Sequence, residues 1–251
     1  MIDLHSHILA GLDDGAATLE ESLAIARASV QDGITMVAAT PHVRDDYPTT
    51  PDAMEECLEQ LRQALRRHEI ALDVRGGGEI AIEWIDRLSD ADLRRFGLGG
   101  NPDYLLIEFP YVGWPLALPQ HVFDLASRGI TPVIAHPERN GEVQASPERL
   151  EPLVRGGALV QVTAASLDGR LGRRPMKTGR KLIQVGLAQL IASDAHSPAI
   201  RGSGLAAAAD AIGDRTLARW LTYDVPHAMA EQLPLPPRPA RPERWRQSSG
   251  S

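Results

Sequence analysis

The first seven residues of the chain, Met1 to His7, have the sequence MIDLHSH. The run from Met1 to Leu4 is short and largely apolar, which is typical of a buried β-strand, and His5 and His7 follow it directly. Alternate residues of a strand point to the same side, so two imidazoles at this spacing can bind one metal ion. This stretch therefore predicts a strand whose C-terminal end carries metal ligands.

Short apolar runs recur through the chain and predict seven strands. They are Met1 to Leu4, Ile34 to Ala39, Ala71 to Val74, Tyr104 to Ile107, Ile130 to Ala135, Ala158 to Val162 and Ala188 to Ala192. Segments with helical periodicity separate them, at 18–31, 51–68, 84–95, 118–127, 147–155 and 176–185, and two more lie near 205–212 and 216–223. Thr18 with Glu21, and Ser146 before Pro147, are typical helix starts. This alternation predicts an α/β fold with parallel strands joined by right-handed crossovers.

Side chains of the types that bind metals follow most of these runs. They are His5, His7, His42, Glu79, Glu108, His136, Asp194 and His196. Successive groups are separated by about one strand and one helix, except before Asp194, where the sixth strand ends in Thr163 and supplies no ligand. In a parallel β/α barrel the C-terminal ends of all strands open on one face, so these side chains are expected to converge. Imidazoles and carboxylates gathered in this way predict a multinuclear divalent-metal site.

Each of these residues alone has an ordinary structural explanation. A single His or Glu at a strand end more often satisfies a hydrogen bond than binds a metal, and it is the placement of five of the eight histidines at strand ends that favours the metal site. The other three, His68, His121 and His227, are expected to be structural or solvated. Asp13 and Asp14 precede Gly15, as in a turn, although Asp14 also lies on the first loop of the predicted rim.

The glycine run Gly76-Gly77-Gly78 precedes Glu79 and resembles a phosphate-binding loop only in part. It lacks the Lys and Ser/Thr that follow such a loop, so we expect it to allow close approach of the backbone to the metals.

Composition excludes several classes of protein. The chain has 251 residues, with 26 Lys plus Arg against 33 Asp plus Glu and a formal net charge of −7. This acidic balance argues against non-specific binding of nucleic acid. The apolar runs are too short to span a membrane, and the N-terminus lacks the basic start and apolar stretch of a signal peptide. We therefore expect a cytoplasmic protein without membrane insertion.

Cys57 is the only cysteine, which excludes an internal disulfide and a Cys-rich metal site. A cysteine-based phosphatase would need the Cys-x5-Arg loop, but position 63 is Gln63 and Cys57 falls in a helical stretch. Residues 1–232 are predicted to form one α/β domain, and the Pro-rich and Arg-rich segment 233–251 a flexible appendage.

Six short motifs together resemble the polymerase and histidinol phosphatase (PHP) superfamily, and more closely its capsule-type branch, the metal-dependent bacterial protein tyrosine phosphatases of the CpsB/CapC type. The motifs are Asp3 to His7 (DLHSH), Gly11 to Gly15 (GLDDG), Ala39 to His42 (ATPH), Gly77 to Ile80 (GGEI), His136 to Asn140 (HPERN) and Ser193 to His196 (SDAH). They occur in order from residue 1 to about residue 224. The resemblance implies a distorted seven-stranded β/α barrel that holds three divalent metals.

The resemblance also implies a role for each matching residue. His5, His7, Glu79 and Asp194 would hold the first metal, while Glu79, Glu108 and His136 would hold the second and Asp14, His42 and His196 the third. Arg139 and Arg201 match phosphate-contacting arginines. Manganese is the implied metal, although Fe and Zn suit the same ligands. The implied substrate is a phosphotyrosine protein, namely a tyrosine autokinase of exopolysaccharide export.

Three other functions are consistent with part of this pattern. A PHP-type phosphatase of a small ester such as histidinol phosphate would share every ligand. A metal-dependent amidohydrolase would usually need a strand-end lysine, yet no lysine precedes Lys177. A non-enzymatic barrel is disfavoured because all nine ligand positions carry competent side chains. Tyr111 and Trp114, on the loop after Glu108, could line the rim or simply cap the fold.

Overall fold

The computed structural model describes residues 1–198 and 202–240. All seven predicted strands are present, and three short strands are added to them. The strands are β1 (Ile2–Ser6), β2 (Met36–Ala39), β3 (His42–Arg44), β4 (Tyr47–Pro48), β5 (Asp73–Arg75), β6 (Glu79–Ala81), β7 (Tyr104–Glu108), β8 (Thr131–Ala135), β9 (Leu159–Thr163) and β10 (Leu190–Ala192).

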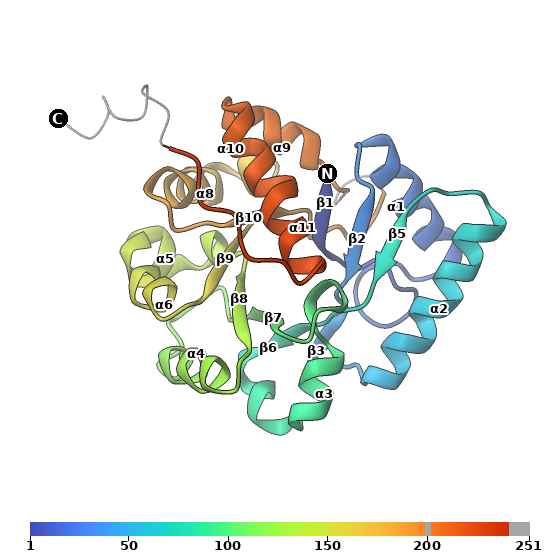
Figure 1. Ribbon diagram of the computed structural model, residues 1–251, viewed down its shortest axis with the longest axis horizontal. Coiled ribbons are helices and arrows are strands. Elements are labelled where there is room, and N and C mark those ends of the chain that lie inside the picture. Colours follow the sequence, from blue (N-terminus) through green and yellow to red (C-terminus); the bar gives the residue numbers. More distant parts are fainter. Residues whose placement is uncertain (199–201, 241–251) are drawn as a thin grey trace.

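Helices surround the strands at the periphery of the molecule (Figure 1). The α-helices are α1 (Leu19–Gln31), α2 (Pro51–Arg67), α3 (Asp90–Arg95), α4 (Leu118–Ser127), α5 (Gly141–Ala145), α6 (Glu151–Arg155), α7 (Ala164–Leu167), α8 (Arg173–Val185), α9 (Leu205–Ile212), α10 (Arg215–Arg219) and α11 (Val225–Ala230). Short 3-10 turns are η1 (Ile82–Arg87), η2 (Leu98–Gly100), η3 (Pro137–Arg139) and η4 (Pro147–Leu150), and η5 (Trp220–Asp224) is a π-helix.

The helix starts follow from local chemistry. The side chain of Thr18 accepts a hydrogen bond from the backbone N–H of Glu21, and the Glu21 carboxylate accepts one from Ala17. This capping is the reason that α1 begins where the sequence predicts it. Thr50 caps α2 in the same way, through the N–H of Ala53.

The strands form two sheets, so a single seven-stranded barrel is not confirmed. One sheet has the order β1-β2-β5, and the other has the order β10-β9-β8-β7-β6-β3-β4. All pairings are parallel except that of β3 with β4. The sheets approach each other just beyond β1 and β10, where His7 N donates to Ala195 O at 2.8 Å and Asp194 N to His5 O at 2.9 Å. Across the described chain, no continuous ladder closes a barrel.

Two sequence breaks explain why the chain passes to the other sheet after β2 and again after β5. β2 ends before Thr40 and Pro41, and proline has no N–H to continue a ladder, so the chain moves on to β3 in the other sheet. Between β5 and β6 lie Gly76 to Gly78. A Cβ on Gly78 would lie 2.6 Å from the ring of Phe96. At Gly78, therefore, the missing side chain allows the backbone to approach a core side chain.

The hydrophobic core fills the space between strands and helices and continues to α11, which packs against β1 and η2. Phe96, Leu4 and Leu105 are among its largest fully buried side chains. No helix among the described residues is both long and apolar enough to cross a membrane.

The segment from residue 233 was predicted to be a flexible appendage. Over residues 233–240 the structure differs from that prediction. Trp220 Nε1 donates to Pro236 O at 3.1 Å, Arg238 donates to Ala188 O at 3.1 Å, and the Arg238 guanidinium lies over the Trp220 ring. The indole N–H of the buried Trp220 and the backbone carbonyl of the buried Ala188, just before β10, are the partners of this Pro-rich stretch. The rest of the predicted appendage, 241–251, lies outside the described residues.

Candidate metal centre

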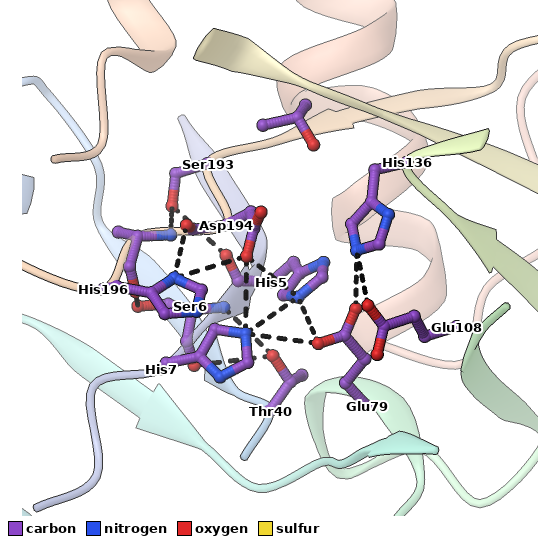
Figure 2. A network of polar contacts seen from close by, with 12 residues as sticks. His5, Ser6, His7, Thr40, Glu79, Glu108, His136, Ser193, Asp194 and His196 are labelled. Carbon is purple, nitrogen blue, oxygen red and sulfur yellow. Dashed lines mark hydrogen bonds and ion pairs between the residues drawn. The ribbon is translucent and has the colours of Figure 1, made fainter. Parts of the chain in front are cut away.

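The breaks and ends of the strands bring nine predicted ligands to one rim of the fold. These residues are His5, His7, Asp14, His42, Glu79, Glu108, His136, Asp194 and His196, and all except Asp14 are buried. His42 and Glu79 are the first residues of β3 and β6 and are directly paired across these strands. Predicted Arg201 lies outside the described residues. Figure 2 shows the part of the cluster around Glu79, whose carboxylate points toward His5, His7 and His136.

The predicted first ligand set comes together most closely. The Nε2 atoms of His5 and His7 are 3.2 Å apart. Each lies 3.3 Å from Glu79 Oε2, and Asp194 Oδ1 is 3.6 Å from His5 and 3.4 Å from His7. Two imidazole nitrogens and two carboxylate oxygens thus face one small volume, which suits a divalent cation.

Glu79 is shared between two sides of the cluster. Its Oε1 lies 2.7 Å from His136 Nε2, and its Oε2 lies 2.9 Å from His42 Nδ1. Glu108 is 3.5 Å from His42 and 3.9 Å from His136. Glu108 is therefore closer to His42 than to His136. His42 is an additional neighbour of the ligand set predicted for the second metal, which comprises Glu79, Glu108 and His136.

The third predicted set also converges. Asp14 Oδ1 lies 3.2 Å from His196 Nε2 and 3.5 Å from His42 Nε2. These three residues and His7 offer donor atoms within 4.8 Å of one another. Asp14 is the most exposed member of the cluster, which places this group toward the solvent side of the rim.

Electrostatics inside the cluster favour the binding of positive charge. Burial alone would lower the pKa of His5, but Glu79 and Asp194 outweigh it and raise that pKa. The pKa of Asp194 is lowered despite burial, because His7, His5 and His136 surround it. Burial and the neighbouring Glu79 raise the pKa of Glu108. Glu79 Oε2 is buried among the imidazoles of His42, His5 and His7 without a hydrogen bond of regular geometry, and a cation held between these groups would neutralise its charge.

A second layer of residues orients the imidazoles. His7 Nδ1 lies 2.6 Å from Asp13 Oδ2, and this oxygen also accepts a hydrogen bond from the backbone N–H of His42 at 2.9 Å. His5 Nδ1 lies 3.0 Å from Gln161 Oε1. Hydrogen bonds on Nδ1 direct Nε2 of both rings toward the shared volume, as is usual for metal-binding histidines.

Sequence reasoning missed both of these supporting residues. Asp13 was assigned to a turn, and it does accept the N–H of Gly15 as turn aspartates do, but the turn aims its second oxygen at His7. The adjacent acid in GLDDG was the available signal. Gln161 lies within β9, where one polar residue in an apolar run gave a weaker signal.

The HPERN block is held rigidly at the rim. Glu138 accepts hydrogen bonds from Thr163 N and Ser166 Oγ. Asn140 donates to Pro110 O and Gly113 O and accepts from the N–H groups of Glu142 and Val143. All the hydrogen-bonding positions of the Asn140 amide are therefore used to join η3, α5 and the loop after β7. The roles of Glu138 and Asn140 were not predicted.

The backbone at two of the candidate ligands is unusual. His136 has φ 33° and Asp194 has φ 55°, and only two other non-glycine residues of the described chain, Glu69 and Gln232, have positive φ. Residues other than glycine rarely adopt this left-handed backbone conformation, and those that do cluster at functional sites.

Arg139 reaches the rim from η3. Its Nη1 donates to Asp194 Oδ2 at 2.7 Å, and its guanidinium lies over the Tyr111 ring at 4.5 Å. The Tyr111 ring is also 5.7 Å from that of His136, whereas Trp114 packs edge-on against Phe109 and beneath Arg149. Of the two predicted aromatics, Tyr111 therefore lies at the rim.

A hollow of about 180 Å³ adjoins the cluster at Glu108 and is lined partly by Arg44 and Tyr111. Arg44 was not predicted. Its Nη1 lies 3.4 Å from Glu108 Oε2, and its guanidinium lies over the Tyr47 ring. The three histidines expected to be structural lie elsewhere, with His121 on α4, His227 on α11 and His68 at the end of α2.

Comparison with known proteins gives consistent matches over nearly the whole chain. Residues 1–225 match the family described as capsular polysaccharide synthesis, CpsB/CapC. The tyrosine-protein phosphatase YwqE of Bacillus subtilis (strain 168) is 39% identical over 198 residues, which cover 78% of this chain and 78% of that protein. The tyrosine-protein phosphatase CpsB of Streptococcus agalactiae serotype III (strain NEM316) is 29% identical over 214 residues, which cover 83% of this chain and 88% of that protein.

A solved structure has the same fold. It comes from work on YwqE from Bacillus subtilis and CpsB from Streptococcus pneumoniae, described as unique metal-dependent tyrosine phosphatases. It superposes with a TM-score of 0.87 at 34% sequence identity, and the match covers 96% of this chain and 100% of that chain.

Proposed function

Because the chain belongs to the CpsB/CapC family of capsular polysaccharide synthesis, we propose that it is a metal-dependent phosphatase that hydrolyses phosphotyrosine in proteins. The observation that carries the proposal is the buried cluster in which Glu79 is shared between imidazoles on two sides. Relatives named as tyrosine-protein phosphatases and metal-dependent tyrosine phosphatases support the reaction and the requirement for metal.

The donor set supports three divalent cations, and we propose manganese. The residues that would hold them are His5, His7, Asp14, His42, Glu79, Glu108, His136, Asp194 and His196. Imidazole and carboxylate donors suit Mn, Fe and Zn, and no thiolate is present to favour a softer metal. When bound, divalent cations lower the pKa of a water molecule toward neutrality and offset the negative charge of a phosphate.

The protein's own side chains would position the substrate. Arg139 has a planar guanidinium with several N–H donors, which matches the geometry of phosphate oxygens. Asp194 already holds this guanidinium at the rim, so its direction is fixed before a substrate binds. We propose Arg201 as a second phosphate contact on the basis of its place in the sequence.

The hollow next to Glu108 suits the aromatic ring of the substrate, since Tyr111 and the stem of Arg44 supply apolar surface beside the cluster. Phenolate is a good leaving group because the pKa of its conjugate acid is about 10, so it needs less assistance than the alkoxide of phosphoserine. As physiological substrate we propose the phosphotyrosine segment of a tyrosine autokinase in capsule or exopolysaccharide synthesis.

One set of assays tests the proposal. Protein stripped with a chelator and then supplied with manganese is compared on a phosphotyrosine peptide, a phosphoserine peptide and histidinol phosphate. We expect turnover of the phosphotyrosine peptide only after manganese is restored, and much slower turnover of the other two. Full activity of the stripped protein would contradict the metal requirement, and faster turnover of histidinol phosphate would assign the site to a small phosphate ester.

A further inference from the structure

The face formed by α5, η4 and α8 carries a second concentration of charge, outside the candidate metal centre. Helix α8 contains five cationic residues and no acidic one, although the chain as a whole has a net charge of −7. The five residues are Arg173, Arg174, Lys177, Arg180 and Lys181, and all are exposed. None of them forms an ion pair with another described residue. Such a patch in an acidic protein is unusual and favours an anionic partner.

The patch is hollowed. A groove of about 630 Å³ runs between α8 and the α5–η4 segment, with Lys177 and Lys181 on one wall and Ala145 and Pro147 on the other. An adjoining hollow of about 310 Å³ extends it along the N-terminal half of α8, past Arg174. Each hollow is of the size range that binds ligands, and their lining combines cations with apolar surface. The nearby acids are Glu142, which pairs with Arg149, and Glu148, which lies close to Lys181.

The groove leads toward the candidate active site. Gln144, which lines both hollows, donates from Nε2 to the carbonyl of Glu138 at 3.0 Å, the residue before Arg139. Gly141, at the end of the second hollow, donates its N–H to Tyr111 O at 2.9 Å. Tyr111 in turn lies against the Arg139 guanidinium. A chain that leaves the metal centre past Tyr111 would therefore enter the groove within a short distance.

We propose that this groove binds an acidic segment of the protein substrate that flanks the phosphotyrosine. The inference rests on the proposed function and names the sequence context that the site selects. Carboxylates of the segment would pair with Lys177 and Lys181, while its apolar side chains would pack against Ala145 and Met176. A peptide suits the groove because it offers negative charge and apolar surface together, and because it can continue from the residue held at Arg139.

The test compares two phosphotyrosine peptides that differ only in the flanking residues, Asp and Glu in one and Asn and Gln in the other. We expect the manganese-loaded wild-type protein to have a KM about five-fold lower for the acidic peptide, as for a few partly exposed ion pairs, and a similar kcat for both. The variant Lys177→Gln/Lys181→Gln should lose this preference and keep its turnover of a small aryl phosphate. The control variant Arg27→Gln/Arg67→Gln removes two exposed cations from α1 and α2, which lie across the molecule from α8 in Figure 1. It should retain the preference for the acidic peptide.

The outcomes separate this inference from the proposed function. If the wild-type protein hydrolyses both peptides with the same KM, or if the groove variant retains the preference, the inference is overturned while the phosphatase assignment stands. If neither peptide is hydrolysed, both the inference about the groove and the phosphatase assignment are overturned. Vesicles of phosphatidylglycerol and phosphatidylcholine provide a further arm. Binding to them that depends on Lys177 and Lys181, without any peptide preference, would assign the groove to a membrane surface instead.

Discussion

The candidate metal centre and the α8 groove both concentrate charge, yet they do so in opposite ways. In the metal centre, imidazoles, which can carry positive charge, and negatively charged carboxylates are buried within a few ångströms of one another. Hydrogen bonds to supporting residues such as Asp13 fix the directions of the imidazoles. In the groove, the cationic side chains of α8 are exposed and form no ion pair with another described residue. Buried charge is weakly screened and demands exact geometry, whereas exposed charge is screened by salt and tolerates movement. The first arrangement suits chemistry and the second suits selection of a partner.

The largest effect is expected at the centre of the buried cluster. Loss of a residue that supports a metal ligand usually lowers activity by about 10- to 100-fold. His136→Ala should reduce turnover by more than this, because it removes a candidate ligand that contacts Glu79. The fold should be retained, since the core is separate from the cluster. Steady-state kinetics with manganese and circular dichroism check both statements. His121→Ala, on α4, is the matched control, and appreciable activity of His136→Ala would exclude it from the metal centre.

Arg139→Ala comes next. Loss of one preorganised donor to a phosphate oxygen should lower kcat/KM by about 100-fold for any phosphate ester, large or small. Arg139→Lys should restore only part of this loss, because it keeps the charge but not the planar pair of donors. Arg149 also lies over an aromatic ring but away from the cluster, so Arg149→Ala is expected to leave turnover of an aryl phosphate unchanged. Unaltered kinetics of Arg139→Ala would remove this residue from the mechanism.

A smaller effect is expected in the supporting layer. Asp13→Asn should weaken manganese affinity or turnover by about 10-fold, at the low end for such residues. The amide replaces one acceptor oxygen with a donor that faces the N–H of His42 or the ring of His7. Titration of the stripped protein with manganese measures the change. Asp210→Asn, an exposed position on α9, removes the same charge as a control, and equal affinities in the two variants would reduce Asp13 to a turn residue.

The smallest effect is expected outside both regions. Cys57 lies half-buried on α2, and burial raises the pKa of its thiol, so little reactive thiolate is present at neutral pH. Treatment with iodoacetamide should leave phosphatase activity unchanged, and so should Cys57→Ser. Loss of activity both on alkylation of the wild-type protein and in Cys57→Ser would mean that the thiol, rather than the metal cluster, carries the reaction.

Much of the fold follows from local sequence. The seven apolar runs and the helix start at Thr18 depend on periodicity and capping, which act over a few residues. Ser146, the other predicted start, precedes the 3-10 turn η4 and makes no side-chain cap hydrogen bond. The two sheets do not follow in this way. Their separation depends on Pro41 and on the packing of Gly78 against Phe96, a contact between residues distant in the sequence. Periodicity contains no information about such contacts.

The candidate site shows the same division. Strand ends are recognisable in sequence, so eight of the nine side chains could be named from the apolar runs, and Asp14 from the family resemblance. His42 and Glu79 nevertheless begin β3 and β6, which the apolar runs did not predict. How the nine side chains divide into groups could not be predicted, since the approach of His42 to Glu108 depends on the register of β3 and β6. Asp13, Gln161 and Asn140 act through hydrogen bonds to other polar residues, and a turn aspartate or a strand glutamine has the same sequence appearance whether or not it does so.

At His136 and Asp194 the left-handed backbone would be relaxed best by glycine, whereas the metal centre needs a side chain at both positions. Glycine would adopt these conformations without the roughly 1–2 kcal/mol that a side chain loses there, but it would remove a donor from the rim. In His136→Gly and Asp194→Gly the relief of backbone strain is therefore opposed by the loss of the buried partner of Glu79 and of Arg139, respectively.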